Sequence, residues 1–188
     1  MPRHHDITVP DLTGRRALVT GASDGVGVHI AERLARAGAT VLLPVRNAAK
    51  GRAAADRIHE AVPGARLDVR TLDLSSLGSV EALADDLLRE GEPLNVLIGN
   101  AGLMTPPERK ASADGFELQL ATNHLGHAAL VGRLLPLLRE GRAHVTSQVS
   151  IAANRNAVHW EDLSWERSYD PFKAYSSSKI AFGLFAME

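Results

Sequence analysis

The chain has 188 residues, of which 45% are hydrophobic and 23% are charged, and its formal net charge is −1. This length is typical of one domain with one sizeable core, and the near-zero charge does not favour nucleic acid as a partner. The lack of cysteine excludes disulfides and thiolate metal ligands. We therefore expect one domain without a bound metal, in a reducing compartment.

The sequence also predicts that the protein is not bound to a membrane. Its apolar stretches are far shorter than a bilayer span, and residues 1–6 lack the apolar core of a signal peptide. A cytoplasmic location is therefore expected. His4 and His5 are adjacent, but no third ligand accompanies them, which favours a polar terminus over a metal site.

Apolar runs and helical periodicities alternate along the chain, without repeats or low-complexity linkers. Such alternation favours a parallel sheet with helices on both faces and right-handed crossovers. Ligands of such sheets bind beyond the carboxyl ends of the strands. The predicted strands are 16–20, 40–45, 66–72, 94–99 and 143–149, and the predicted helices are 25–37, 48–61, 76–90, 114–138 and 173–188.

A glycine-rich turn joins the first predicted strand to the first predicted helix. Gly21, Gly25 and Gly27 have the spacing Gly-x-x-x-Gly-x-Gly. Glycine allows tight backbone angles and close approach of a pyrophosphate, while free amides at the helix N-terminus supply hydrogen-bond donors. The order strand, turn, helix therefore indicates a nucleotide-binding site, although a simple strand-to-helix turn also uses glycine.

Tyr175 and Lys179 lie four residues apart, which places them on one face of a helix. There the ammonium can stabilise a phenolate, so that the tyrosine can transfer a proton near neutral pH. A tyrosine and a lysine one turn apart also occur by chance. The glycine turn upstream favours the catalytic interpretation.

Several motifs follow one another along the chain. They are Thr20-Gly21-Ala22-Ser23-Asp24-Gly25-Val26-Gly27, Asn100-Ala101-Gly102 after the fourth predicted strand, Asn123, Ser150, Tyr175 and Lys179. Taken in this order, they resemble the short-chain dehydrogenase/reductase family from about residue 13 to the last residue. The long segment between Ser150 and Tyr175 resembles the retinol-dehydrogenase-like branch of that family.

The resemblance implies a Rossmann-type α/β fold with a doubly wound parallel sheet, and an oxidoreductase that interconverts a carbonyl and an alcohol on a small molecule. The catalytic residues that it implies are Asn123, Ser150, Tyr175 and Lys179. The expected cofactor-binding residues are Gly21, Ser23, Asp24, Gly25, Val26, Gly27, Arg46, Asp73, Leu74, Asn100, Ala101, Gly102, Tyr175 and Lys179.

Each catalytic residue has a role implied by the resemblance. Tyr175 gives the carbonyl oxygen its proton, Lys179 holds the nicotinamide ribose, Ser150 binds the substrate oxygen, and Asn123 supports a water-linked proton path. Ser147 competes with Ser150, but the family pattern places the active serine where the strand opens into a loop. Asn123 has a plainer alternative as a helical asparagine with local hydrogen bonds.

The end of the second predicted strand bears on the choice of cofactor. An acid there would bind the adenosine ribose and repel a 2′-phosphate, whereas an arginine attracts it. Val45 stands at the position expected for the acid and Arg46 follows it, so NADP(H) is preferred, with NAD(H) possible. The alternatives are that Arg46 is a solvated loop residue and that Asp73 only begins a helix.

The sequence departs from the family at three points. Gly99 and Val149 stand where the family often has an additional asparagine and serine. Trp160 and Trp165 in the long loop indicate an apolar wall for a substrate or a cover over the core.

The third departure is the end of the chain, inside the helix with Tyr175, where family members continue with two more strands. We therefore expect residues 1–188 to form a single dinucleotide-binding domain that lacks these strands. An uncovered fifth strand would favour a homo-oligomer. The alternative function is a truncated, catalytically weak nucleotide-binding or interaction module.

Overall fold

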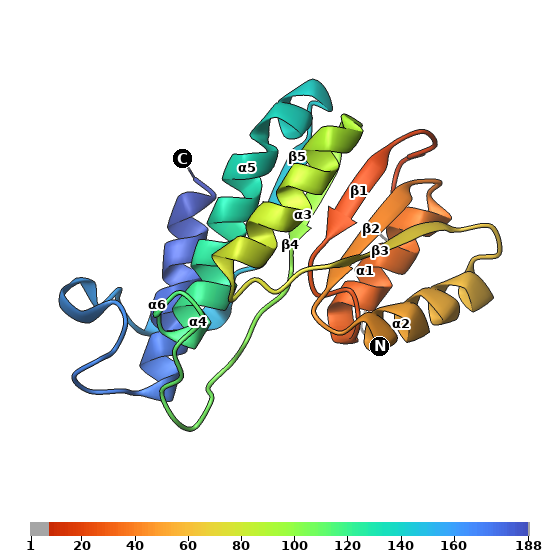
Figure 1. The fold of residues 1–188 in the computed structure, drawn as a ribbon. Coiled ribbons are helices and arrows are strands. Elements are labelled where there is room, and N and C mark those ends of the chain that lie inside the picture. Colours follow the sequence, from red (N-terminus) through yellow and green to blue (C-terminus); the bar gives the residue numbers. More distant parts are fainter. Residues whose placement is uncertain (1–7, 188) are drawn as a thin grey trace.

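The computed structural model describes residues 8–187 and contains a five-stranded parallel sheet with helices on both faces (Figure 1). The strand order is β3-β2-β1-β4-β5, so β3 and β5 form the two edges. This confirms the expected Rossmann-type, doubly wound α/β fold. The strands are β1 Arg16–Val19, β2 Thr40–Val45, β3 Arg66–Thr71, β4 Val96–Gly99 and β5 His144–Ser147.

The helices follow the predicted order. Among residues 8–187, no helix is both long and apolar enough to span a bilayer. The α-helices are α1 Gly25–Arg36, α2 Ala48–Ala61, α3 Leu77–Glu90, α4 Leu118–Leu120, α5 Gly126–Glu140 and α6 Pro171–Phe185, and the shorter elements are a π-helix, η1 Ala121–Leu125, and the 3₁₀ helices η2 Ile151–Arg155 and η3 Trp160–Asp162.

The prediction of a helix from residue 114 was wrong at its start. Gly115 has φ +87°, and Ala111 forms an isolated bridge with Glu117, so these residues make a turn. Helical structure begins at Leu118, because the Glu117 carboxylate accepts a hydrogen bond from Leu120 N at 2.7 Å.

The last helix begins two residues earlier than predicted. The Asp170 carboxylate caps it by accepting hydrogen bonds from Phe172 N and Lys173 N, and Pro171 occupies the first helical position, where no N–H is needed. The helix ends at Phe185. Residue 188 and the histidine pair at 4–5 lie outside the described residues.

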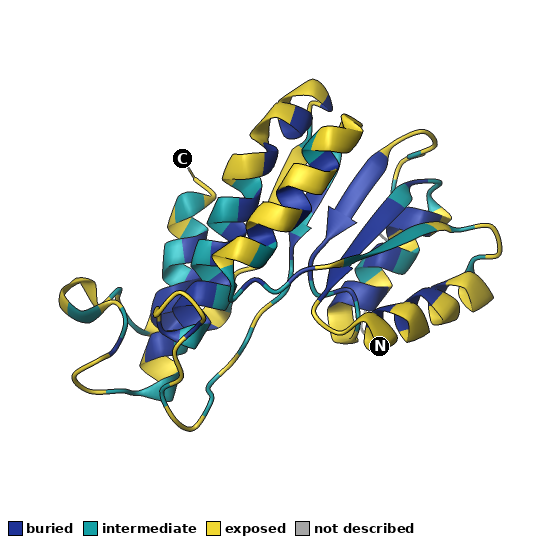
Figure 2. Ribbon diagram, in the orientation of Figure 1, coloured by how far each residue is buried: buried dark blue, intermediate teal, exposed yellow. Residues whose placement is uncertain are grey.

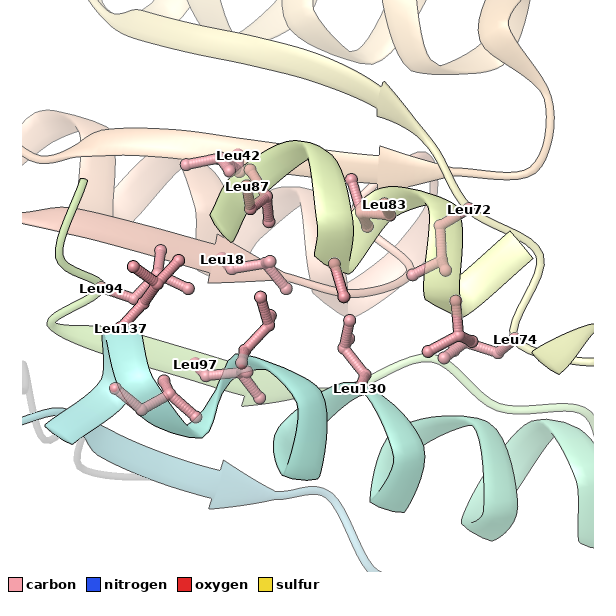
Figure 3. Close-up of a cluster of buried hydrophobic side chains, with 14 residues drawn as sticks. Leu18, Leu42, Leu72, Leu74, Leu83, Leu87, Leu94, Leu97, Leu130 and Leu137 are labelled. Atoms are coloured by element: carbon pink, nitrogen blue, oxygen red, sulfur yellow. The ribbon is translucent and has the colours of Figure 1, made fainter. Parts of the chain in front are cut away.

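Two cores flank the sheet, one on each face, because successive side chains of a strand point to opposite faces. Ala17 and Val19 pack against α1 and α2, where alanines let the helices approach closely. Leu18 and Leu97 face the other side, toward leucines of α3 and α5 such as Leu130 (Figure 3). The strands β1 and β2 are buried almost throughout, β4 is buried at alternate residues, and the outer sides of the helices are exposed (Figure 2).

Gly126 at the start of α5 lies against the backbone of the loop that follows β3. A Cβ at this position would collide with Leu74 O, whereas a Cβ at Gly132 in the same helix would meet nothing within 4 Å. The absence of a side chain at Gly126 therefore sets how closely α5 packs beside the carboxyl end of the sheet.

Replacing these two glycines should have opposite effects on stability. Gly126→Ala should lower the free energy of unfolding by about 2 kcal/mol or more, because backbone must move to accommodate the methyl group. Gly132→Ala should raise it by about 0.5–1 kcal/mol through helix propensity. Urea denaturation of both variants tests this, and equal effects would show that Gly126 is not constrained by packing.

Candidate active site

The glycine turn forms a backbone cradle between β1 and α1. Gly21 and Gly25 have φ of +69° and +56°, a region that disfavours other residues. A Cβ on Gly27 would collide with Gly21 O and lie 2.7 Å from Asn100 Nδ2. A Cβ on Gly25 would meet nothing within 4 Å, so this side of the turn is open to an approaching group. The cradle therefore fits a pyrophosphate beside the N-terminus of α1.

Thr20 joins this turn to the loop after β4. Its Oγ1 accepts hydrogen bonds from Asn100 N and Ala101 N, both at 3.0 Å, and its carbonyl accepts one from Asn100 Nδ2 at 3.0 Å. Thr20 is fully buried. The Asn100-Ala101-Gly102 segment is thus held directly against the glycine turn.

A groove of about 590 Å³ runs along the carboxyl ends of the strands. It lies where ligands of parallel sheets are expected to bind. Tyr175 and Lys179 of the predicted set are not in its wall. The other predicted cofactor-binding residues all line it: Gly21, Ser23, Asp24, Gly25, Val26, Gly27, Arg46, Asp73, Leu74, Asn100, Ala101 and Gly102.

One end of the groove carries the residues expected to contact adenosine. Arg46 is exposed there, directly after the buried Val45 that ends β2. Asp73 Oδ1 accepts hydrogen bonds from Ser75 N at 2.9 Å and Ser75 Oγ at 2.6 Å. Asp73 therefore shapes the turn before α3 and also lines the groove, so its two interpretations are compatible.

Asn123 does not have the local hydrogen bonds of the plainer alternative. It is fully buried in the π-helix η1, a distortion that often marks functional sites. Its Oδ1 accepts from Leu103 N at 2.8 Å, and its Nδ2 donates to Leu103 O at 2.9 Å and to Ser178 Oγ at 2.9 Å. Ser178 Oγ in turn donates to Tyr175 O at 2.7 Å. Asn123 thus holds the loop beyond Gly102 and the middle of α6 together.

Lys179 lies on α6 and points toward the same loop. Its Nζ donates to Gln148 O at 2.8 Å and lies 5.8 Å from the centroid of the Phe182 ring. Burial lowers the pKa of Lys179. A Cβ built on Gly102 would be 3.4 Å from both Lys179 Nζ and Asn123 Oδ1. Both predicted catalytic residues therefore lie directly beside Gly102, which lines the groove, although neither is itself in the wall.

The two predicted catalytic hydroxyls are placed on separate elements. Tyr175 lies half-buried one turn before Lys179 on α6, and Ser150 caps η2, where its Oγ accepts from Ala152 N at 3.2 Å. Among residues 8–187, no hydrogen bond joins Ser150 to Tyr175. Ser147 is the last residue of β5, three positions before Ser150.

His127 links the glycine turn to Asn123, and sequence analysis missed it. Thr20 Oγ1 already accepts two backbone N–H groups, and its own proton has two acceptors within reach, His127 Nε2 at 2.9 Å and the more distant Ile98 O at 3.3 Å. Nδ1 of His127 lies 3.3 Å from Asn123 O, which can only accept, so this contact favours the ring proton on Nδ1 and leaves Nε2 to accept from Thr20. The ring stacks on Phe182 with centroids 4.8 Å apart. Only the position of His127 one turn after Asn123 hinted at this role in the sequence.

Phe182 also explains why Gly99 replaces the family's additional asparagine. A Cβ on Gly99 would lie 2.7 Å from Phe182 Cζ and 3.2 Å from His127 Cδ2. Phe182 is almost fully buried. The glycine therefore makes room for an aromatic ring beside Lys179.

The two tryptophans of the long loop have different surroundings. Trp165 is 6% exposed and its ring stacks on that of His159 with centroids 4.9 Å apart, so it is buried within the loop and does not form an open apolar wall. Trp160 is 70% exposed.

No cluster of three or more potential metal ligands occurs in the part of the chain that is described.

A family model described as short chain dehydrogenase matches residues 15–188. The chain belongs to this family. It is 40% identical over 178 residues to retinol dehydrogenase 12 from Bos taurus, which is 94% of this chain and 56% of that protein. It is 38% identical over 185 residues to polyprenol dehydrogenase from Mus musculus, covering 96% of this chain and 55% of that protein. The chain thus spans little more than half the length of these relatives.

Solved structures with the same fold agree. An uncharacterized protein from Mycobacterium paratuberculosis has a TM-score of 0.83 and 40% identity, over 95% of this chain and 62% of that one. A metagenomic short-chain oxidoreductase in complex with NADP has a TM-score of 0.75 and 26% identity, over 94% and 75% of the two chains. Both share the fold of this chain, and the second is a short-chain oxidoreductase, in agreement with the family.

Burial, and secondarily the charge of Lys179, lowers the pKa of His127 from 6.5 to about 4. The unfolded chain therefore binds this proton more readily than the folded chain. The stability linked to His127 is fully present above about pH 6.5 and is lost as the pH falls toward about 4, by about 3 kcal/mol.

Urea unfolding at about pH 7 and about pH 4.5 should show a smaller loss on acidification in His127→Gln than in the wild type, because an amide does not titrate. His144→Gln, at an exposed histidine, is the control and should behave like the wild type. An unchanged pH dependence in His127→Gln would contradict the assignment of a buried neutral imidazole.

Proposed function

We propose that the protein is an NADP(H)-dependent oxidoreductase that interconverts a carbonyl and an alcohol, with residues 1–188 acting as one dinucleotide-binding domain. The observation that carries this proposal is the convergence of Lys179 and Asn123 on Gly102, at the wall of a groove whose other lining residues suit a dinucleotide. A nucleotide-binding module without chemistry has no need for a buried lysine beside a residue of that wall.

When bound, the nicotinamide supplies or accepts the hydride. The glycine turn binds the pyrophosphate through backbone amides, and Arg46 pairs with the 2′-phosphate. Tyr175 gives the substrate oxygen its proton during reduction and takes it back during oxidation. Lys179 stabilises the phenolate that remains and holds the nicotinamide ribose, while Ser150 donates to the substrate oxygen.

Asn123 has a positioning role in this proposal and supports a water-linked proton path beside Lys179. Its side chain already holds Leu103 and Ser178, and through Ser178 the backbone of Tyr175. A buried network whose polar groups are all hydrogen-bonded holds its members in a fixed relative position. Proton transfer depends steeply on that position.

The names of two relatives, a retinol and a polyprenol dehydrogenase, favour an apolar alcohol or aldehyde as the substrate. Val149 and Ile151 flank Ser150 and are exposed, and Trp160 of the same loop is exposed too. These side chains suit the apolar part of such a substrate. We also propose a homo-oligomer, since β5 is an edge strand with exposed residues from His144 to Thr146.

Arg46→Gln should lower the affinity for NADPH by about tenfold or more and leave the affinity for NADH nearly unchanged, since a charge-assisted bond to the 2′-phosphate is lost. Fluorescence titration with each reduced cofactor measures both constants. Arg52→Gln, at an exposed residue on α2, is the control. Equal wild-type affinities, or a variant that retains the full preference, would contradict the role of Arg46.

Tyr175→Phe should lower turnover of aldehydes by about a hundredfold or more while NADPH affinity stays nearly unchanged, because only the acidic proton is removed. Tyr169→Phe is the matched control, since the Tyr169 hydroxyl donates to Pro106 O in a structural contact. Lys179→Ala should impair both turnover and binding. A Tyr175→Phe variant that keeps most of its rate would show that the proton donor has been misassigned.

A further inference from the structure

Arg57 reaches the glycine turn from the helix that packs beside it. It lies on α2, and its Nη2 donates to Ser23 O at 3.3 Å. Ser23 belongs to the turn and lines the proposed cofactor groove. The two residues are 34 positions apart, so the packing of α2 alone brings this cation to the turn.

The guanidinium of Arg57 has N–H donors that this one contact does not use. It lines a second hollow, of about 270 Å³, that shares Asp24 and Gly25 with the cofactor groove. Glu32, the other acid of this hollow, pairs with Arg36 at 2.7 Å. Among residues 8–187, no carboxylate pairs with Arg57, and a guanidinium has five N–H donors.

Asp24 makes this cation relevant to the choice of cofactor. Its exposed carboxylate sits in the turn, where its Oδ1 accepts from Gly25 N at 2.8 Å. A carboxylate there repels an incoming phosphate and opposes the attraction of Arg46. Arg57, which donates to the neighbouring Ser23 O and lines the same hollow as Asp24, brings a positive charge that offsets this carboxylate.

We infer that Arg57 is a second specificity-determining residue for the adenosine 2′-phosphate, acting together with Arg46. This inference rests on the proposed NADP(H) function. Arg57 offsets the charge of Asp24 and adds an attractive field at the adenosine end of the groove. Both effects also act on the pyrophosphate that the two cofactors share, but NAD(H) has no 2′-phosphate and therefore gains less from them.

Arg57 could alternatively have a purely structural role, like that of an arginine that joins the same two helices. Arg36 Nη2 on α1 donates to Ala61 O at 3.3 Å, a contact that ties α1 to the end of α2. If Arg57 were only a similar clamp on the turn, its removal would weaken both cofactors equally. The test therefore compares the two cofactors rather than one.

The experiment is calorimetric titration of the full chain with NADPH and with NADH, for the wild type, Arg57→Gln, Arg57→Lys and the control Arg52→Gln. Arg57→Gln should reduce the preference for NADPH by about threefold to tenfold, the size of one screened surface charge interaction. Its NADH affinity should fall by a smaller factor than its NADPH affinity, because NADH has only the shared pyrophosphate. Arg57→Lys, which keeps the charge, and Arg52→Gln should retain most of the preference, and the effect should shrink at high salt.

The inference is overturned if Arg57→Gln binds both cofactors more weakly by the same factor. It is also overturned if the wild type prefers NADPH and Arg57→Gln keeps the same preference. Either result leaves the proposed function intact. A wild type that binds neither dinucleotide overturns the proposed function itself. Thermal unfolding of each variant shows whether it is folded. Because Arg57 is exposed, its replacement should change the unfolding temperature little.

Discussion

The buried hydroxyl of Thr20 is the contact on which the rest of the site depends. It lies at the end of β1, between the glycine turn and the loop after β4, and its oxygen accepts the two backbone N–H groups of Asn100 and Ala101. Unpaired, these groups would carry a desolvation cost of about 1–3 kcal/mol each. A threonine at this point therefore fixes the two loops that form the cradle and the opposite wall of the groove.

From Thr20 a chain of buried polar contacts runs through His127 to Asn123, and from Asn123 through Ser178 to the backbone of Tyr175. Each member is satisfied by the next, so moving one leaves a buried group without a partner. This couples the position of the nucleotide cradle to that of the helix with Tyr175 and Lys179. In the proposed function, one network thus positions both the cofactor-binding turn and the proposed proton donor.

The sequence predicted those features that depend on residues close to one another along the chain. The strands, the glycine turn and the four-residue spacing on α6 are local patterns, and the groove residues follow because parallel strands end at one edge. The start of the helix at Leu118 was missed, because the capping role of Glu117 depends on a turn set by Gly115. His127 and Arg57 were missed, because their partners lie 107 and 34 positions away. Such contacts arise from packing and have no local signal.

The central claim is that the groove binds the dinucleotide along the glycine turn and ends at Lys179. A crystal structure of the protein with NADPH tests it most directly. The account predicts the pyrophosphate on the backbone amides at the start of α1, the 2′-phosphate beside Arg46, and the nicotinamide ribose within hydrogen-bond distance of Lys179 Nζ. A dinucleotide bound away from the glycine turn, or a nicotinamide ribose out of reach of Lys179, would contradict it.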